Sequence, residues 1–94
     1  MARQPIVGKL EEALRRYDES FQLMRETGNL RYLGLFMGFQ AGALAEMGDI
    51  EDAEAALDEA EELHNQTGDP RHLENARLQR GFVELARARA LYEA

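Results

Sequence analysis

The sequence predicts an all-α fold of about four helices, which pair as antiparallel hairpins. Apolar residues recur at steps of three and four along most of the 94 residues, and this spacing places them on one face of a helix. Proline is scarce, with Pro5 near the start of the chain and Pro70 in an expected loop, so neither interrupts a periodic stretch. Glycine-containing turn sequences separate the periodic stretches from one another.

The first helix is expected to begin at Lys9, after a frayed leader over residues 1–7. It should end at Gly28, because glycine readily adopts the left-handed conformation that closes a helix. Its expected core-facing residues are Leu10, Ala13, Leu14, Tyr17, Phe21 and Met24.

The second helix is expected over residues 30–47 and is apolar on nearly every side, which indicates a buried helix. Gly48 and Asp49 should end it, and the Asp49 carboxylate is expected to cap the third helix by accepting N–H bonds from Glu51 or Asp52. The third helix is acidic with a thin apolar stripe, which indicates a half-exposed helix running to about residue 66. That stripe consists of Ile50, Ala53, Leu57, Ala60 and Leu63.

The fourth helix is expected to begin at about Pro70, with Asp69 as its N-cap, because the fixed φ of proline suits a first helical turn. It should continue to near the C-terminus. Its expected apolar contacts are Leu73, Ala76, Phe82, Val83, Leu85, Ala86 and Ala90.

An internal repeat relates the two halves of the chain. Residues 26–33 align with residues 66–73 at a constant separation of forty positions, and the same separation relates Ala41 to Gly81. A period in this range with two helices per unit is typical of stacked helical hairpins.

The middle unit resembles the tetratricopeptide (TPR) family. The first helix of a TPR hairpin carries a small residue followed three positions later by a large one, as Ala41 and Leu44 are here. The second helix carries an alanine, then a bulky residue and another alanine, matched by Ala53, Leu57 and Ala60. Longer units of this kind are similar to the TPR regions of bacterial regulatory and signalling proteins. The resemblance implies a single domain over residues 1–94, with a half repeat at 9–28, a full repeat at 30–66 and a half repeat at 70–94.

This resemblance implies a non-enzymatic module for protein–protein interaction or assembly, with a regulatory role. In TPR proteins the first helices of the hairpins form a concave surface that binds extended or helical peptides. The expected groove residues are Leu35, Gly38, Phe39, Gly42, Glu46, Asn75, Gln79 and Phe82, and their mainly apolar character favours an apolar ligand. Two alternatives stay open, namely a homodimeric helical bundle without a TPR-type groove and a module that binds a small apolar molecule.

Three glycines, Gly34, Gly38 and Gly42, lie four positions apart inside the second helix. Each costs roughly 1 kcal/mol relative to alanine in a helix interior, so a contact should offset that loss. We expect close packing against a neighbouring helix. In the alternative interpretation the same glycines line the concave groove.

The outermost helices are expected to leave apolar residues partly uncovered. These residues are Tyr17 and Phe21 at one end, and Phe82, Val83 and Leu85 at the other. A homodimer would bury them, and so would a longer array of repeats.

The formal charge of −7 argues against binding to a nucleic-acid backbone. Eight acidic residues and no Lys or Arg lie between positions 50 and 69, whereas five Arg and three Glu follow from position 71. Neighbouring helices are therefore expected to complement one another in charge. The apolar run at residues 33–44 is shorter than the ~20 residues of a membrane span, so a cytoplasmic protein without membrane association is expected.

No catalytic, cofactor-binding or metal-binding site is expected. The chain has no cysteine, and nearly all of its acids fall on expected exposed faces. His64 follows Glu61 at a spacing found in metal-binding helical bundles, but the second such pair that these sites need is missing. His72 is expected at the edge of a loop, without a facing carboxylate cluster.

Overall fold

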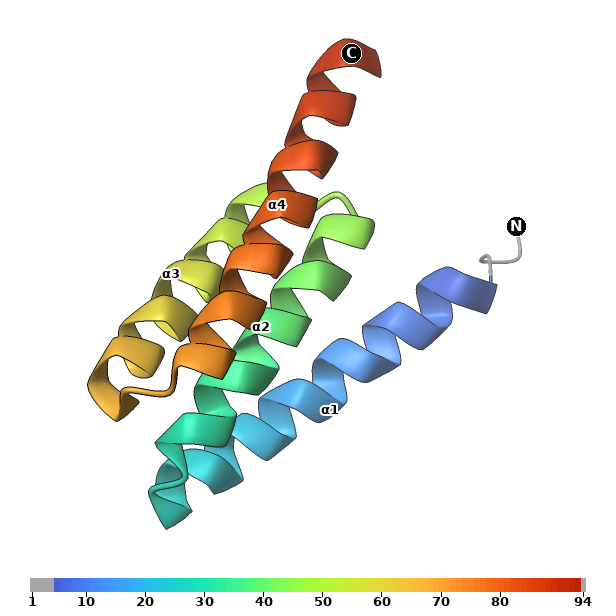
Figure 1. Cartoon of the computed structure of the whole chain (residues 1–94). Helices are drawn as coiled ribbons and strands as arrows, with labels where there is room; N and C mark the ends of the chain where they lie inside the picture. The colour runs from blue at the N-terminus through green and yellow to red at the C-terminus, as the bar shows by residue number, and fades with distance from the viewer. Residues whose placement is uncertain (1–4, 94) are drawn as a thin grey trace.

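The computed structural model describes residues 5–93, which form four α-helices (Figure 1). They are α1 (Pro5–Thr27), α2 (Leu30–Glu46), α3 (Ile50–Thr67) and α4 (Pro70–Glu93). The all-α prediction is confirmed, and the predicted boundaries of α2 and α3 are correct to within one residue. The predicted start of α1 is wrong, because residues 5–7 are already helical and Pro5 suits a first helical turn. Residues 1–4, the rest of the predicted leader, lie outside the described residues.

The three turns between the helices share one backbone feature. A glycine with positive φ follows each preceding helix, at 73° for Gly28, 87° for Gly48 and 72° for Gly68. The next residues, Asn29 and Asp49, have φ and ψ of −84° and 64° in one case and −85° and 66° in the other. The predicted closure of the first helix at Gly28 is confirmed. Each turn folds the chain back along the helix that precedes it (Figure 1).

The two predicted N-caps behave differently. Asp69 caps α4 as predicted, since the Arg71 backbone N–H donates a 3.0 Å hydrogen bond to Asp69 Oδ1. Asp49 accepts no capping hydrogen bond, so that prediction is wrong. Its ψ of 66° lies outside the extended region from which an N-cap side chain usually reaches the next turn.

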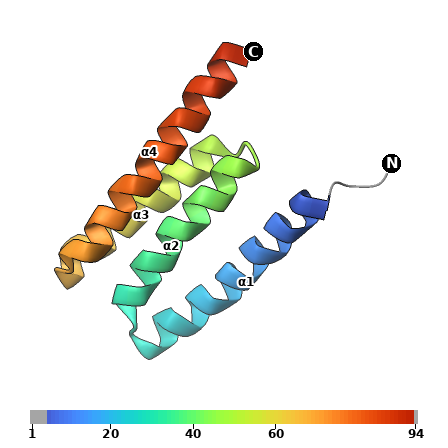
Figure 2. The same ribbon diagram turned by 45° about the vertical axis from the view of Figure 1, so that its right-hand side comes forward.

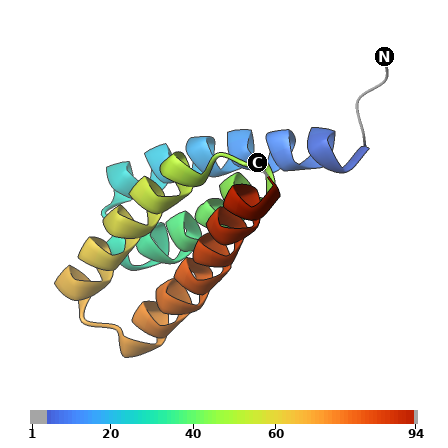
Figure 3. The same cartoon turned by 90° about the horizontal axis from the view of Figure 1, so that it is seen from above.

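α2 is the central helix, and it contacts each of the other three (Figure 3). Leu33 and Met37 from its first half pack with Phe21 of α1 and Ala60 of α3. Its second half belongs to another cluster, made of Ala41, Ala45, Ala53, Ala56, Leu57 and Val83. The nearly continuous apolar sequence of α2 follows from this central position.

α1 packs through its C-terminal half and diverges from the other helices toward its N-terminal end (Figure 2). Phe21 is only 4% exposed, because it lies in the cluster that joins α1 to α2 and α3. Tyr17 is half-buried, with its ring stacked 5.9 Å from that of Phe21. The prediction that Phe21 is partly uncovered is therefore wrong.

The acidic α3 and the arginines of α4 complement each other, as predicted. Arg80 donates 2.8 Å hydrogen bonds to Glu61 and Asp58, and Arg87 pairs with Glu54. The hydrogen bond to Glu61 is the main reason that the pKa of Arg80 is raised above its ordinary value. These ion pairs hold one face of α4 against α3.

α2 and α4 lie side by side and run in the same direction. Near their N-terminal ends, the rings of Tyr32 and His72 have centroids 6.2 Å apart. Farther along, Gly42 and Phe82 line one cavity. Both pairs are separated by forty positions in the sequence. The internal repeat of the sequence thus corresponds to two parallel, neighbouring helices.

Candidate functional site

Three of the eight predicted groove residues form the contact between α2 and α4. A Cβ placed on Gly38 would lie 3.7 Å from Asn75 Nδ2 and 4.0 Å from Gln79 Cγ. Gly38 itself is buried. This position belongs to close packing between helices, which is the interpretation we favoured for the glycines.

The neighbouring glycines of α2 also lie close to side chains of other helices. A Cβ on Gly34 would lie 2.8 Å from His64 Cε1, and a Cβ on Gly42 would lie 2.8 Å from Gln79 Oε1. Gly34 therefore accommodates a ring from α3, whereas Gly42 accommodates the flexible end of a side chain from α4.

Three further predicted residues, Gly42, Glu46 and Phe82, do line a common cavity of about 460 Å³ between the C-terminal half of α2 and α4. Leu85 and Arg89 of α4 line the same space. The lining combines apolar surface with charges of both signs, which is the chemistry of an amphipathic partner rather than of a purely apolar one.

The side of α4 that faces away from the core carries exposed apolar side chains, which we call the outer stripe. It consists of Leu78, Phe82 and Leu85, which share one helix face and are 58%, 54% and 57% exposed. Phe82 and Leu85 are exposed, which confirms the prediction that they are partly uncovered. The separate prediction that both make apolar contacts in the core is wrong. The prediction of uncovered residues is wrong for Val83, which is 1% exposed because it packs in the core cluster with α2 and α3.

The last two predicted residues lie on α2. Leu35 is half-buried, and Phe39 is 37% exposed with its ring 5.9 Å from that of Phe36. Tyr32, also on α2, is 50% exposed and was not predicted. Aromatic side chains are thus accessible on both α2 and α4.

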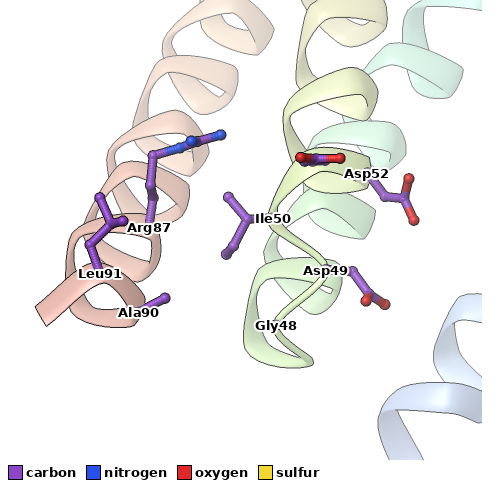
Figure 4. A pocket seen from close by; sticks show the side chains of 8 residues that line it. Gly48, Asp49, Ile50, Asp52, Arg87, Ala90 and Leu91 are labelled. Carbon is purple, nitrogen blue, oxygen red and sulfur yellow. The ribbon is translucent and has the colours of Figure 1, made fainter. Parts of the chain in front are cut away.

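A second cavity of about 470 Å³ lies where the turn between α2 and α3 approaches the end of α4 (Figure 4). Ile50 points across it toward α4, whereas Asp49 and Asp52 point away. Arg87, on the opposite wall, already pairs with Glu54. Arg87 therefore serves the packing of α4 against α3.

Sequence reasoning missed a buried polar cluster where α2, α3 and α4 meet. His64 and Asp69 are 2% and 7% exposed. The His64 ring lies 5.5 Å from that of His72, and His72 Nε2 lies 3.8 Å from Asp69 Oδ2. His72 lies in the first turn of α4, at the edge of the loop as predicted, and it faces the single carboxylate of Asp69. The three-residue spacing of Asp69 and His72 at a helix start was the available signal, because it places both on one face.

Neither ring nitrogen of His64 has a hydrogen-bond partner within residues 5–93. Burial, and after it the nearby His72, lowers the pKa of His64 below its ordinary value. Burial alone would raise the pKa of Asp69, but hydrogen bonds from Arg71 outweigh it and lower that pKa. His64 is therefore a neutral packing residue at ordinary pH.

Among residues 5–93, no group of three or more His, Cys, Asp or Glu is placed to hold a metal ion. Over the same part of the chain, no helix is both long enough and apolar enough to cross a membrane. Comparisons with protein-family models, with curated proteins and with solved structures found no match.

Proposed function

We propose that this chain is a protein-interaction module of the TPR type, which binds a helical segment of a protein partner along the outer stripe of α4. The stripe is the observation that carries the proposal, because three large apolar side chains on one face are each more than half exposed. The opposite face of α4 buries Ala76 and Val83. Helices that are apolar on two sides usually pack against a partner on each of those sides.

The repeat supports a helix as the occupant. α4 packs on α2 at Gly38 and Gly42, and the residues forty positions later are Leu78 and Phe82 of the outer stripe. A further helix on the outer stripe, running in either direction, would therefore cover the same positions of α4 that α4 covers on α2. Nearest-neighbour stacking of this kind is how helical-repeat proteins extend and how they bind helices.

A small apolar ligand fits this face less well. The cavity beside Gly42 is lined by Glu46, Arg89 and Glu93 as well as by apolar side chains. Asn75 and Gln79 cover Gly38, so no flat apolar floor is open there. Charged groups beside an exposed apolar stripe suit an amphipathic helix.

The test is selection from a displayed library of helical peptides, with purified wild-type protein as bait. We expect the selected peptides to bind Phe82→Glu about tenfold more weakly or worse, because the variant places a carboxylate in the apolar contact. Leu23→Glu is the matched control, since Leu23 is 61% exposed on α1, away from the stripe. Peptides that bind Phe82→Glu as tightly as wild type would contradict the proposal.

A further inference from the structure

We infer that the helix that docks on the outer stripe is α4 of a second copy of this chain, lying antiparallel to the first. This inference rests on the proposed function and names its partner. Its basis is that the exposed face of α4 is complementary to itself, as the interface of a two-fold symmetric dimer must be.

The first complementarity is one of shape. The residues of this face are arranged symmetrically about a midpoint between Gly81 and Phe82. When two α4 helices cross antiparallel at this midpoint, Phe82 of each copy lies over Gly81 of the other, and Leu78 meets Leu85. A Cβ on Gly81 would meet nothing within 4 Å in its own chain, so no internal contact requires glycine there. Glycine in a helix interior costs stability relative to alanine, and a ring seated from outside would offset that cost.

The second complementarity is one of charge. Glu74 lies four residues before Leu78, and Arg89 lies four residues after Leu85, so the two charges are also symmetric about the midpoint. In the antiparallel pair, Glu74 of each copy meets Arg89 of the other. A parallel pair would instead bring like charges together, so the charges select the antiparallel arrangement.

These two charges are free for such a contact. Arg80 and Arg87, on the inner side of α4, pair with acids of α3. Glu74 and Arg89 form no hydrogen bond or ion pair with any residue of the described chain, 5–93. Arg80 and Arg87 thus hold α4 against α3, whereas Arg89 is available to a partner.

The face is accessible to a second copy. In Figure 1, α4 lies in front of α2 and α3, and no other helix crosses its outer side. The contact uses one helix from each copy, which places it at the small end of specific interfaces. We therefore expect a dissociation constant on the order of micromolar.

Charge reversal tests the pairing by sedimentation equilibrium at low salt. Glu74→Arg and Arg89→Glu should each weaken the dimer about tenfold or more, because each turns two attractive contacts into repulsive ones. The double variant should dimerise like wild type, and an equimolar mixture of the two single variants should form a heterodimer. Single variants that match wild type, or a double variant that stays monomeric, would overturn the pairing.

Gly81→Ala separates dimerisation from folding. The added methyl group meets nothing in its own chain, so the melting temperature of the dilute monomer should rise. The same methyl group occupies the space into which the Phe82 ring of the other copy packs, so the dimer should weaken. A variant that is destabilised as a monomer, or that dimerises as tightly as wild type, would count against the inference.

The orientation and the identity of the partner are tested together. The chain has no cysteine, so Leu78→Cys mixed with Leu85→Cys reports only the engineered contact. We expect the mixed disulfide to form faster than either symmetric one, and equal rates would contradict the antiparallel crossing. A wild-type chain that sediments as a monomer at every concentration would overturn this inference. Selected peptides that bind wild type and lose affinity for Phe82→Glu would still support the proposed function in that case.

Discussion

At the scale of single residues, the contact between His64 and Gly34 explains why each is present. The imidazole ring occupies the space that a side chain at position 34 would need, at 2.8 Å from the nearest ring carbon. Leu63 lies close as well, with its Cβ at 3.2 Å from the same point. A glycine inside a helix is unfavourable in isolation, and here it allows α3 to approach α2 closely.

The glycines of α2 should therefore respond differently to the same substitution. Gly34→Ala should destabilise the protein by about 1 to 2 kcal/mol, because the overpacking cost exceeds the gain in helix propensity. Gly38→Ala should stabilise it by up to about 1 kcal/mol, since its nearest neighbour would lie at an ordinary 3.7 Å. Urea denaturation of both variants measures the two changes. Changes of the same sign would contradict the packing described for Gly34.

The same histidine makes stability depend on pH. The pKa of His64 is lowered in the folded state, so the unfolded state binds the proton at a higher pH. The contribution of His64 to the free energy of unfolding is fully present above about pH 6.5. It is lost as the pH drops below that value, by at most about 1.4 kcal/mol per pH unit. His72, Asp69 and Glu61 are the other titratable groups that act on His64.

Denaturation of wild type and His64→Leu between pH 7 and pH 5 isolates this contribution. Leucine fills a similar volume without a titrating group, so the pH slope should become smaller in this interval, by at most one proton. His72 and Asp69 are unchanged in both proteins and serve as the common background. Identical slopes would show that His64 is not the group responsible.

At the scale of helices and turns, the boundaries could be predicted because they are set locally. Gly28, Gly48 and Gly68 each take the positive φ that ends a helix, and this preference is a property of glycine itself. The capping roles were harder to predict. Asp49 and Asp69 both precede helices, but only Asp69 accepts a capping hydrogen bond, which depends on backbone angles that the sequence does not specify.

This difference predicts unequal effects of alanine at the two caps. Asp69→Ala should lower the melting temperature by on the order of 5 °C, because it removes the hydrogen bond to Arg71 and leaves His72 without its carboxylate. Asp49→Ala should change it much less, since Asp49 makes no capping hydrogen bond. Thermal denaturation by circular dichroism measures both. A larger loss for Asp49→Ala would contradict the assignment.

At the scale of the whole molecule, the repeat of forty positions was the most informative signal in the sequence. It relates Tyr32 to His72 and Gly42 to Phe82, and both pairs lie together between α2 and α4. The repeat could be seen because turns and helix lengths recur along the chain. It could not tell which apolar face of α4 is buried, so Phe82 and Val83 were predicted to be alike although only Val83 lies in the core.

The candidate site was predictable only in part, for the same reason. Gly42, Glu46 and Phe82 were expected together and do line one cavity. Gly38 was expected either in the packing between helices or in the binding groove. The contact with Asn75 of α4 decides for packing, and the sequence does not reveal that contact. The spacing of Asp69 and His72 reveals part of the polar cluster, but the approach of His64 from α3 is a tertiary contact that no local pattern reveals.

The most direct test of the account is the solution mass of the chain by light scattering across a concentration series, with Phe82→Glu measured alongside. The outer stripe is the proposed binding surface, so wild type should approach twice the monomer mass at high micromolar concentration while Phe82→Glu stays monomeric. Leu23→Glu should behave like wild type, because Leu23 is exposed on α1. A wild-type chain that remains monomeric throughout, or a Phe82→Glu variant that still doubles in mass, would contradict self-association through α4.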